Sequence, residues 1–229
     1  KNRGKIMKLA AVIVAGGSGK RFGAAKPKQF LILNKKPVFE WSIKAFKKLK
    51  ECTDIILVVP QDRIDEMLKY KKQYGIEVVA GGKERFDSVK NGLKAVGKDI
   101  DLVAVHDAAR PLITPEIIKN VMKAAYENGA AIAAVNSKDS VKFSKSGTKI
   151  TKSLDRKNIW YAQTPQIFKK EIIEKAYAGR ISASTTDDAQ LVEKKGVKST
   201  LVFASYENFK ITEQTDFLLA QAILKKRGE

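Results

Sequence analysis

The sequence predicts an α/β protein of the Rossmann-like kind, a three-layer fold in which helices cover both faces of a mostly parallel sheet. Short apolar runs recur along the chain, and helical patterns separate most of them, as expected of parallel strands joined by helices. The segments GGSGKR and HDAAR follow two of these runs. Ligands of such sheets bind beyond the carboxyl ends of the strands, so we expect the functional site at that edge.

Strands and helices are expected in alternation along most of the chain. The apolar runs predict strands buried on both faces at residues 9–15, 55–59, 77–80, 102–106, 130–135 and 200–204. Helical periodicity predicts helices at residues 37–50, 63–72, 87–96, 115–129, 168–179, 185–196 and 213–227. For the helix that starts at residue 115, Thr114 is the expected N-cap and Gly129 the expected stop.

The alternation breaks between residues 137 and 160. This segment predicts two short strands around Ser146 and Gly147, a pattern typical of a β-hairpin. It has few large apolar residues and no helix partner, and an isolated hairpin is at best marginally stable. We therefore expect one domain over residues 1–229, with residues 137–160 as a β-arm that lies on the domain or pairs with another subunit.

The composition fits a soluble globular protein and narrows the choice of partners. Apolar residues make up 44% of the 229 residues and charged residues 30%, while the formal net charge is +19. Such a charge suits a nucleic-acid binder, an enzyme that handles phosphates or a Lys-rich surface. The lysines are scattered through the predicted helices, and no zinc-finger or RNA-binding sheet pattern occurs. Nucleic acid is therefore not expected to be the main partner.

Cysteine usage and hydropathy favour the cytoplasm. Cys52 is the only cysteine, so an internal disulfide is impossible and a reducing compartment is favoured. No apolar run approaches the roughly 20 residues that a membrane-spanning helix needs. The basic start and first apolar run lead directly into a glycine loop, which favours a first buried strand over a secretion signal.

The loop after the first apolar run gathers glycines and cations, yet it departs from both familiar phosphate loops. The NTPase P-loop needs Ser or Thr after Gly-Lys, whereas Arg21 follows Lys20 here. The dinucleotide fingerprint needs Gly or Ala where this chain has Phe22. What remains is a tight turn whose backbone N–H groups can face an anion, with the planar donors of Arg21 and the point charge of Lys28 beside it.

Several segments together resemble one enzyme family. The stretch VAGGSGKRFG with the later PKQF is similar to the signature loop of nucleotidyltransferases that join a nucleoside triphosphate to a sugar or polyol phosphate. Further matches resemble the 2-C-methyl-D-erythritol 4-phosphate cytidylyltransferase family in their order and spacing. They are GGKERFDSV (81–89), VHDAARP (105–111), DRKNIWYAQTPQIF (155–168), TTDDA (185–189) and NFKITEQTD (208–216).

The resemblance implies a reaction between two anions. A phosphate of the polyol substrate attacks the α-phosphorus of CTP and releases pyrophosphate, in isoprenoid precursor synthesis by the non-mevalonate pathway. Charge repulsion and the charge that develops at phosphorus are the main obstacles, so catalysis should depend on positioning and on cations. The cofactor implied is Mg²⁺ or another divalent cation.

The resemblance also implies roles for individual residues. The catalytic residues are Arg21, Lys28, Asp107 and Lys210. The CTP-binding residues are Ala15, Gly16, Gly17, Gly19, Gly82, Lys83 and Ser88, the first four around the triphosphate and the others at the cytosine. The residues for the second substrate are Asp107, Arg110, Ser140, Arg156, Thr164, Thr186 and Lys210. Asp107 is also the candidate metal ligand, because it follows a strand end that faces the triphosphate.

Three features complete this interpretation. Ser140 stands where the family usually has Thr, and because the hydroxyl is kept, recognition should survive. His106, the only histidine, directly precedes Asp107 in a buried strand, so its side chain should point to the opposite face and be structural. In this family the 137–160 hairpin exchanges with a partner subunit, so we expect a homodimer in which Ser140 and Arg156 complete the neighbour's site.

Two other functions stay open at this point. A ribitol 5-phosphate cytidylyltransferase resembles this sequence in the glycine loop, in HDAARP and in the arm, and the polyol pocket separates the two. A non-catalytic nucleic-acid binder would use the positive surface instead and would show steeply salt-dependent binding.

Overall fold

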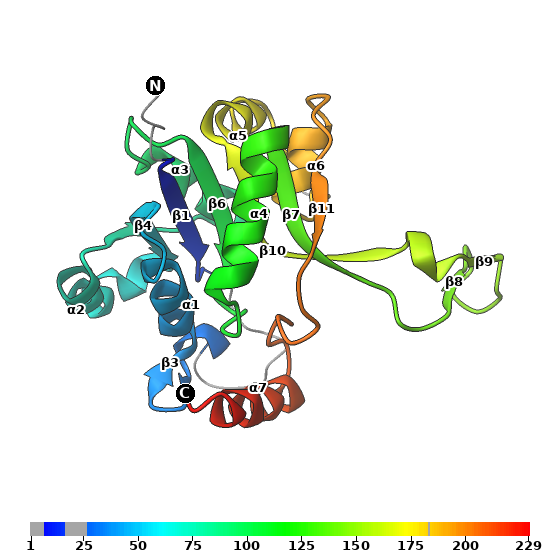
Figure 1. Cartoon of the computed structure of the whole chain (residues 1–229), viewed down its shortest axis with the longest axis horizontal. Coiled ribbons are helices and arrows are strands. Elements are labelled where there is room, and N and C mark those ends of the chain that lie inside the picture. The colour runs from blue at the N-terminus through cyan, green and yellow to red at the C-terminus, as the bar shows by residue number, and fades with distance from the viewer. Residues whose placement is uncertain (1–6, 17–26, 183) are drawn as a thin grey trace, which may run out of the picture.

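The structure, a computed structural model, describes residues 7–16, 27–182 and 184–229. Its centre is a seven-stranded sheet of order β11-β7-β10-β6-β1-β4-β5 (Figure 1). The strands are β1 (Leu9–Val14), β4 (Cys52–Val59), β5 (Glu77–Ala80), β6 (Leu102–Asp107), β7 (Ala130–Asn136), β10 (Trp160–Lys169) and β11 (Thr200–Phe203). Only β10 runs antiparallel to its neighbours among these strands, so the predicted mostly parallel sheet is confirmed.

Helices cover both faces of the sheet, as predicted. They are α1 (Val38–Lys47), α2 (Ile64–Tyr74), α3 (Arg85–Lys94), α4 (Pro115–Asn128), α5 (Lys170–Tyr177), α6 (Asp188–Glu193) and α7 (Gln214–Lys226). Successive residues of β1 divide between two apolar clusters, because side chains alternate along a strand. Ile13 packs with α1, α2 and α4 on one face, and Val12 packs with α3, α5 and α6 on the other. In Figure 1, α4 crosses in front of the sheet.

Local signals account for the ends of α4. The Thr114 hydroxyl accepts a hydrogen bond from the backbone N–H of Ile117, and Pro115 occupies the first turn, where a missing N–H costs little. The helix ends at Gly129, whose φ of 89° would strain any residue with a Cβ. The sequence predictions for both ends are confirmed.

The strand predictions differ from the structure in three places. Strand β5 was predicted to be buried on both faces, but it lies at one edge of the sheet, and its first residue, Glu77, is exposed. Strand β10 was not predicted, because Gln163, Thr164, Pro165 and Gln166 interrupt any apolar run. Strand β11 was predicted to be buried on both faces, but it lies at the edge of the sheet. Its burial alternates, and Phe203 is 56% exposed, so one face of this strand meets solvent.

The predicted hairpin exists and stands away from the sheet (Figure 1). Its strands, β8 (Val141–Phe143) and β9 (Lys152–Leu154), pair antiparallel, and Gly147 lies between them with a φ of 77°. Its apolar side chains find little cover, since Phe143 is 41% and Ile150 is 65% exposed. Its packing against a second subunit stays a prediction.

Two smaller features lie below the sheet in Figure 1. The short strands β2 (Ile32–Leu33) and β3 (Lys36–Pro37) pair with each other, and a third apolar cluster joins Leu33 and Trp41 to Leu224 of α7. None of the helices in the described ranges is both long and apolar enough to cross a lipid bilayer.

Candidate active site

The carboxyl ends of β1 and β6 form the core of the site. Val14 and Asp107 are paired in register, and the backbone N–H of Ala108 donates to the Val14 carbonyl over 3.0 Å. The residues that follow β1 and β6 therefore start from the same edge of the sheet. This places Ala15 and Gly16 next to Asp107, as the sequence predicted for the two strand ends.

The predicted cytosine-binding residues converge on the hydroxyl of Ser88. Ser88 is buried, and its Oγ accepts a 3.1 Å hydrogen bond from the backbone N–H of Gly82. A Cβ added at Gly16 would lie 3.1 Å from this Oγ, and one added at Gly81 would lie 2.8 Å from it. A larger residue at Gly81 would thus displace the Ser88 hydroxyl, and one at Gly16 would crowd it. Lys83 lies in the same turn with an exposed side chain.

Asp107 is a buried carboxylate held by two cations. Its Oδ2 accepts a 2.7 Å hydrogen bond from Lys210 Nζ, and its Oδ1 accepts a 3.1 Å hydrogen bond from Arg85 Nε. Burial alone would raise the pKa of Asp107, but the charges of Arg85, Lys210 and Arg110 outweigh it and hold the pKa well below its usual range. The carboxylate is therefore ionised throughout the physiological range.

Arg85 was missed by the sequence analysis. It lies inside the GGKERFDSV segment, and its NH2 donates over 2.8 Å to Oδ2 of Asp188, a fully buried residue. No sequence spacing relates Arg85 to Asp107 or Asp188, so the only available signal was its place in a segment that carries the resemblance. The fold brings the three together at the ends of different elements.

A second set of hydrogen bonds ties residues 208–211 to the loop after β6. Arg110 NH1 donates to the Asn208 carbonyl over 2.8 Å, and the Ile211 N–H donates to the Ala109 carbonyl over 2.8 Å. These bonds hold Lys210 against Asp107. Among the described residues, Arg110 makes no ion pair with Asp107, and its Nε is buried without a hydrogen-bond partner.

Thr164 and His106 form a polar chain behind Asp107. The Asp107 N–H donates to Thr164 Oγ1 over 3.0 Å, and this hydroxyl lies 3.1 Å from His106 Nδ1. His106 Nε2 lies 3.2 Å from the Arg110 carbonyl, which can only accept, so Nε2 carries the proton and Nδ1 accepts from Thr164. The ring is fully buried and meets the edge of Phe46. His106 thus points away from the Arg85 side, as predicted.

The pH dependence of stability should report this buried histidine. Burial lowers the pKa of His106 to about 4, whereas an unfolded histidine titrates near 6.5. The neutral ring is therefore favoured in the folded protein. Its contribution to the free energy of unfolding is full above pH 6.5 and is lost as the pH falls toward 4. That loss is about 3 kcal/mol. We expect the melting temperature to fall between pH 7 and 5 less steeply in His106→Gln, and equal slopes would contradict this.

Lys28 approaches the same edge from another segment. It begins the 3-10 helix η2 (Lys28–Phe30). Burial would raise the pKa of Asp216 at the start of α7, but hydrogen bonds from Thr212 and Glu213 and the charge of Lys28 hold it below its usual range. Lys28 therefore lies near Asp216, at the start of α7. Of the other predicted phosphate-binding residues, Gly17, Gly19 and Arg21 lie outside the described residues.

The remaining predicted residues lie farther from Asp107. Thr186 is exposed and precedes α6, and its backbone N–H donates to Gln190 Oε1 over 3.1 Å. Ser140 and Arg156 lie on the arm, where Arg156 NH1 donates to the Lys138 carbonyl. In the described chain, no hydrogen bond or ion pair joins these two arm residues to Asp107 or Lys210.

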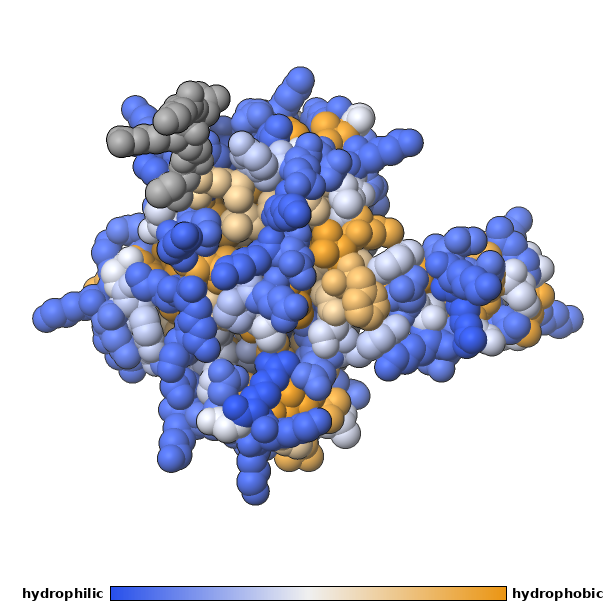
Figure 2. Space-filling view, in the orientation of Figure 1, coloured by the Kyte–Doolittle hydropathy of each residue, from blue (hydrophilic) through white to orange (hydrophobic). Residues whose placement is uncertain are grey.

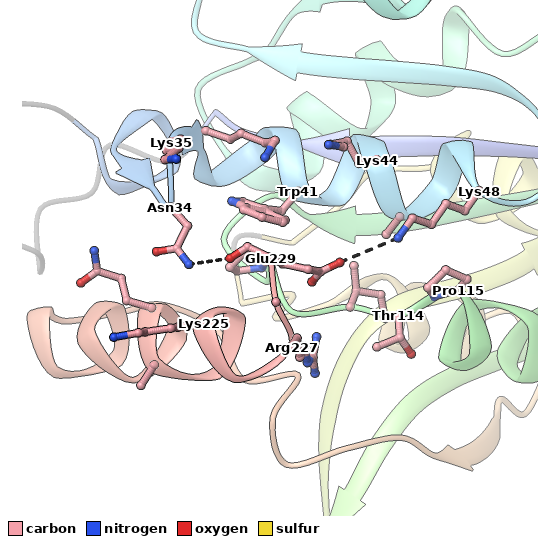
Figure 3. A pocket seen from close by; sticks show the side chains of 17 residues that line it. Asn34, Lys35, Trp41, Lys44, Lys48, Thr114, Pro115, Lys225, Arg227 and Glu229 are labelled. Carbon is pink, nitrogen blue, oxygen red and sulfur yellow. Dashed lines mark hydrogen bonds and ion pairs between the residues drawn. The ribbon is translucent and has the colours of Figure 1, made fainter.

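A cavity of about 1310 Å³ lies apart from Asp107, between α1, α7 and the residues that precede α4. Figure 3 shows lysine side chains around it, and Glu229 reaches into it to pair with Lys48 and to accept from Asn34. None of the residues that the resemblance assigns lines this cavity. Asp107 is not among its lining residues either, so the candidate active site is the sheet edge at Asp107.

Comparisons with known proteins agree with this geometry. A profile of the 2-C-methyl-D-erythritol 4-phosphate cytidylyltransferase family matches residues 9–226. A relative of that name from Endomicrobium trichonymphae is 51% identical and covers 96% of this chain and 100% of its own. Another from Syntrophus aciditrophicus is 42% identical and covers 96% and 97%.

Solved structures give the same result. The 4-diphosphocytidyl-2C-methyl-D-erythritol synthase of Anaerococcus prevotii has a TM-score of 0.84 at 31% identity, covering 96% of this chain and 100% of its own. The 2-C-methyl-D-erythritol 4-phosphate cytidylyltransferase of Thermus thermophilus has a TM-score of 0.79 at 28% identity, with the same coverage. The similarity thus spans the sheet, the helices and the arm segment.

Proposed function

The chain belongs to the 2-C-methyl-D-erythritol 4-phosphate cytidylyltransferase family, and from this membership we infer that it transfers the cytidylyl group of CTP to 2-C-methyl-D-erythritol 4-phosphate. The products are 4-diphosphocytidyl-2-C-methyl-D-erythritol and pyrophosphate. The observation that carries this proposal is the sheet edge where the turn around Ser88 meets an Asp107 carboxylate held by Arg85 and Lys210. It supplies a turn with free backbone groups and a charged centre side by side.

The chemistry suits this arrangement because neither reactant needs a general base. The attacking phosphate is already ionised, and it must approach a triphosphate that repels it. Cations and backbone N–H groups that face the reacting phosphorus stabilise the charge that develops there. We assign this work to Lys28 and Lys210, together with Arg21 and the backbone of the glycine loop. The neutral, buried His106 takes no part in proton transfer.

Nucleotide recognition is assigned to the turn around Ser88. The cytosine edge carries donors and acceptors that a hydroxyl and backbone groups can match. A different base would leave those protein groups without hydrogen-bond partners. Gly82 and Ser88 supply these groups, and Lys83 contributes through its backbone. Ala15, Gly16, Gly17 and Gly19 are assigned to the phosphates.

The second substrate is assigned to the sheet edge at Asp107, where Lys210 meets the carboxylate and Thr164 supports it from behind. Arg110 carries a buried Nε without a hydrogen-bond partner among the described residues, and its positive charge helps to hold the pKa of Asp107 low. Thr186 lies on the loop that leads to Asp188, and Ser140 and Arg156 lie on the arm. Together with Lys210, these side chains offer hydroxyls for the polyol and cations for its phosphate.

A divalent cation fits this site only as a partner of the nucleotide. The described residues contain no group of three or more His, Cys, Asp or Glu side chains that could hold a metal ion by themselves. Mg²⁺ commonly binds one carboxylate together with substrate phosphates, so Asp107 is the residue that would hold it. Bound there, the cation would supply neutralisation of phosphate charge.

The arm and the compartment complete the proposal. The protein forms a homodimer, in which the arm of each subunit reaches the site of the other. An apolar area lies near β11 on the side from which the arm extends (Figure 2), and Leu201 and Phe203 of that strand are exposed. The enzyme acts in the cytoplasm, where the single Cys52 stays reduced. Burial raises the pKa of that thiol to about 12, which keeps it unreactive.

Pyrophosphate release with different substrate pairs tests the proposal. We expect rapid release with CTP and 2-C-methyl-D-erythritol 4-phosphate, at least 100-fold slower release with ATP, GTP or UTP, and no release after EDTA treatment. Ribitol 5-phosphate should be a poor second substrate. A faster reaction with ribitol 5-phosphate would assign the enzyme to that polyol, and no release with any pair would contradict the proposal.

A further inference from the structure

We propose that Arg85 is a positioning residue that fixes Asp107 for the second substrate by bracing it against the buried carboxylate of Asp188. This inference rests on the proposed function. It concerns a side chain to which the resemblance assigned no role.

The guanidinium of Arg85 spans two carboxylates from distant parts of the chain. Its Nε donates to Asp107 Oδ1 over 3.1 Å, and its NH2 donates to Asp188 Oδ2 over 2.8 Å. A planar fork with fixed donor directions can hold both at once, whereas a lysine ammonium is a single point at the end of a flexible stem. The orientation of the Asp107 carboxylate therefore depends on a fork, and not only on a positive charge.

Asp188 is a rigid anchor for this fork. It is fully buried, and its Oδ1 accepts a hydrogen bond from Tyr177 of α5. Its backbone N–H donates over 3.1 Å to Gln166 Oε1 in β10. The anchor is thus fixed by α5, β10 and the start of α6.

The Arg85 guanidinium occupies only one oxygen of the Asp107 carboxylate and leaves the other oxygen to Lys210. Because Arg85 takes Oδ1, Lys210 Nζ can approach Oδ2, at 2.7 Å. Asp188 is also two residues beyond Thr186, so Arg85 fixes the distance between Asp107 and the loop assigned to the polyol. A change of about 1 Å in such a position can cost about 100-fold in rate.

Arg85 lies at the start of α3, beside the turn assigned to cytosine, yet its side chain is not part of that turn. Glu84 and Asp87 form the capping box that begins α3, and Ser88 is held by Gly82 and Glu84. Substitution of the Arg85 side chain leaves these contacts in place. The kinetic effect should therefore fall on the polyol phosphate and on kcat, and the KM for CTP should stay within about twofold.

The test compares Arg85→Lys with Tyr74→Phe in steady-state assays of the full chain. Arg85→Lys keeps the charge and should lower kcat/KM for 2-C-methyl-D-erythritol 4-phosphate by roughly 10- to 100-fold. Tyr74→Phe removes a 2.6 Å hydrogen bond to Glu40 on α1, far in the fold from Asp107 and Asp188, so it should lower the melting temperature without changing kcat or either KM. It is the control for loss of stability alone.

A third variant keeps the proposal testable if Arg85→Lys folds poorly. Asp188→Asn removes the anchor's charge and keeps its shape, and it should shift the same parameters in the same direction. The double variant should lose little more kcat/KM than Arg85→Lys alone, because both changes remove the same Arg85–Asp188 interaction. Wild-type turnover with an unchanged kcat/KM in Arg85→Lys and Asp188→Asn would overturn the role of Arg85. An inactive wild-type protein would instead refute the proposed function.

Discussion

Lys28→Ala is expected to remove most turnover while the protein stays folded. Lys28 begins η2 and presents its charge toward the start of α7, near the segment that carries Lys210. A fixed cation at the reacting phosphates stabilises charge that develops only in the transition state, and loss of one such group costs roughly 100- to 1000-fold in kcat. Pyrophosphate release at saturating CTP measures this loss. Arg21→Ala should have a similar effect.

The control for Lys28→Ala is a lysine of equal charge outside the site. Lys123 lies exposed on α4, and Lys123→Ala removes the same net charge without touching a predicted substrate. We expect it to leave kcat and both KM values within about twofold. Near-normal turnover in Lys28→Ala and Arg21→Ala would remove the electrostatic basis of the proposal. Steeply salt-dependent nucleic-acid binding that these two changes leave unaffected would then favour a non-catalytic nucleic-acid-binding protein.

The parallel part of the sheet could be predicted from the sequence because its strands are short apolar runs. Burial on both faces forces such a composition, and Leu102–Asp107 and Ala130–Asn136 are clear examples. Strand β10 lies between them but carries Gln163, Thr164 and Gln166, whose polar groups bond within the site. Its residues were recognised as a motif and not as a strand, because the demands of the site override the apolar pattern there.

Parts of the site could be predicted only where chemistry leaves a local signature. Glycines at a strand end and a carboxylate after a buried strand are such signatures, and Gly16, Ser88 and Asp107 were found through them and through the resemblance. Arg85 and Asp188 were not, because an arginine and an aspartate 103 residues apart carry no mutual signal in one sequence. Their pairing exists only after α3 and α6 pack on the same face of the sheet.

A mixed dimer should recover activity that neither of its parent variants has. Lys28→Ala damages the catalytic edge, and Arg156→Ala damages the arm, whose η4 (Arg156–Asn158) carries that side chain on an exposed surface. If each site takes its core from one subunit and its arm from the other, neither homodimer has an intact site. The mixed dimer has one intact site, formed by the core of the Arg156→Ala subunit and the arm of the Lys28→Ala subunit.

Co-expression of the two variants with different affinity tags, followed by purification over both, isolates this mixed dimer. We expect about half the wild-type kcat per dimer, because one of the two sites is complete, whereas each parent homodimer should stay at least about 100-fold below it. An arm that served its own subunit would give a different result. Each subunit of the mixed dimer would then carry one damaged component of its own site, so no activity would return. A protein that runs as a monomer in gel filtration at assay concentration would also exclude the exchange, because no second subunit could then supply an arm.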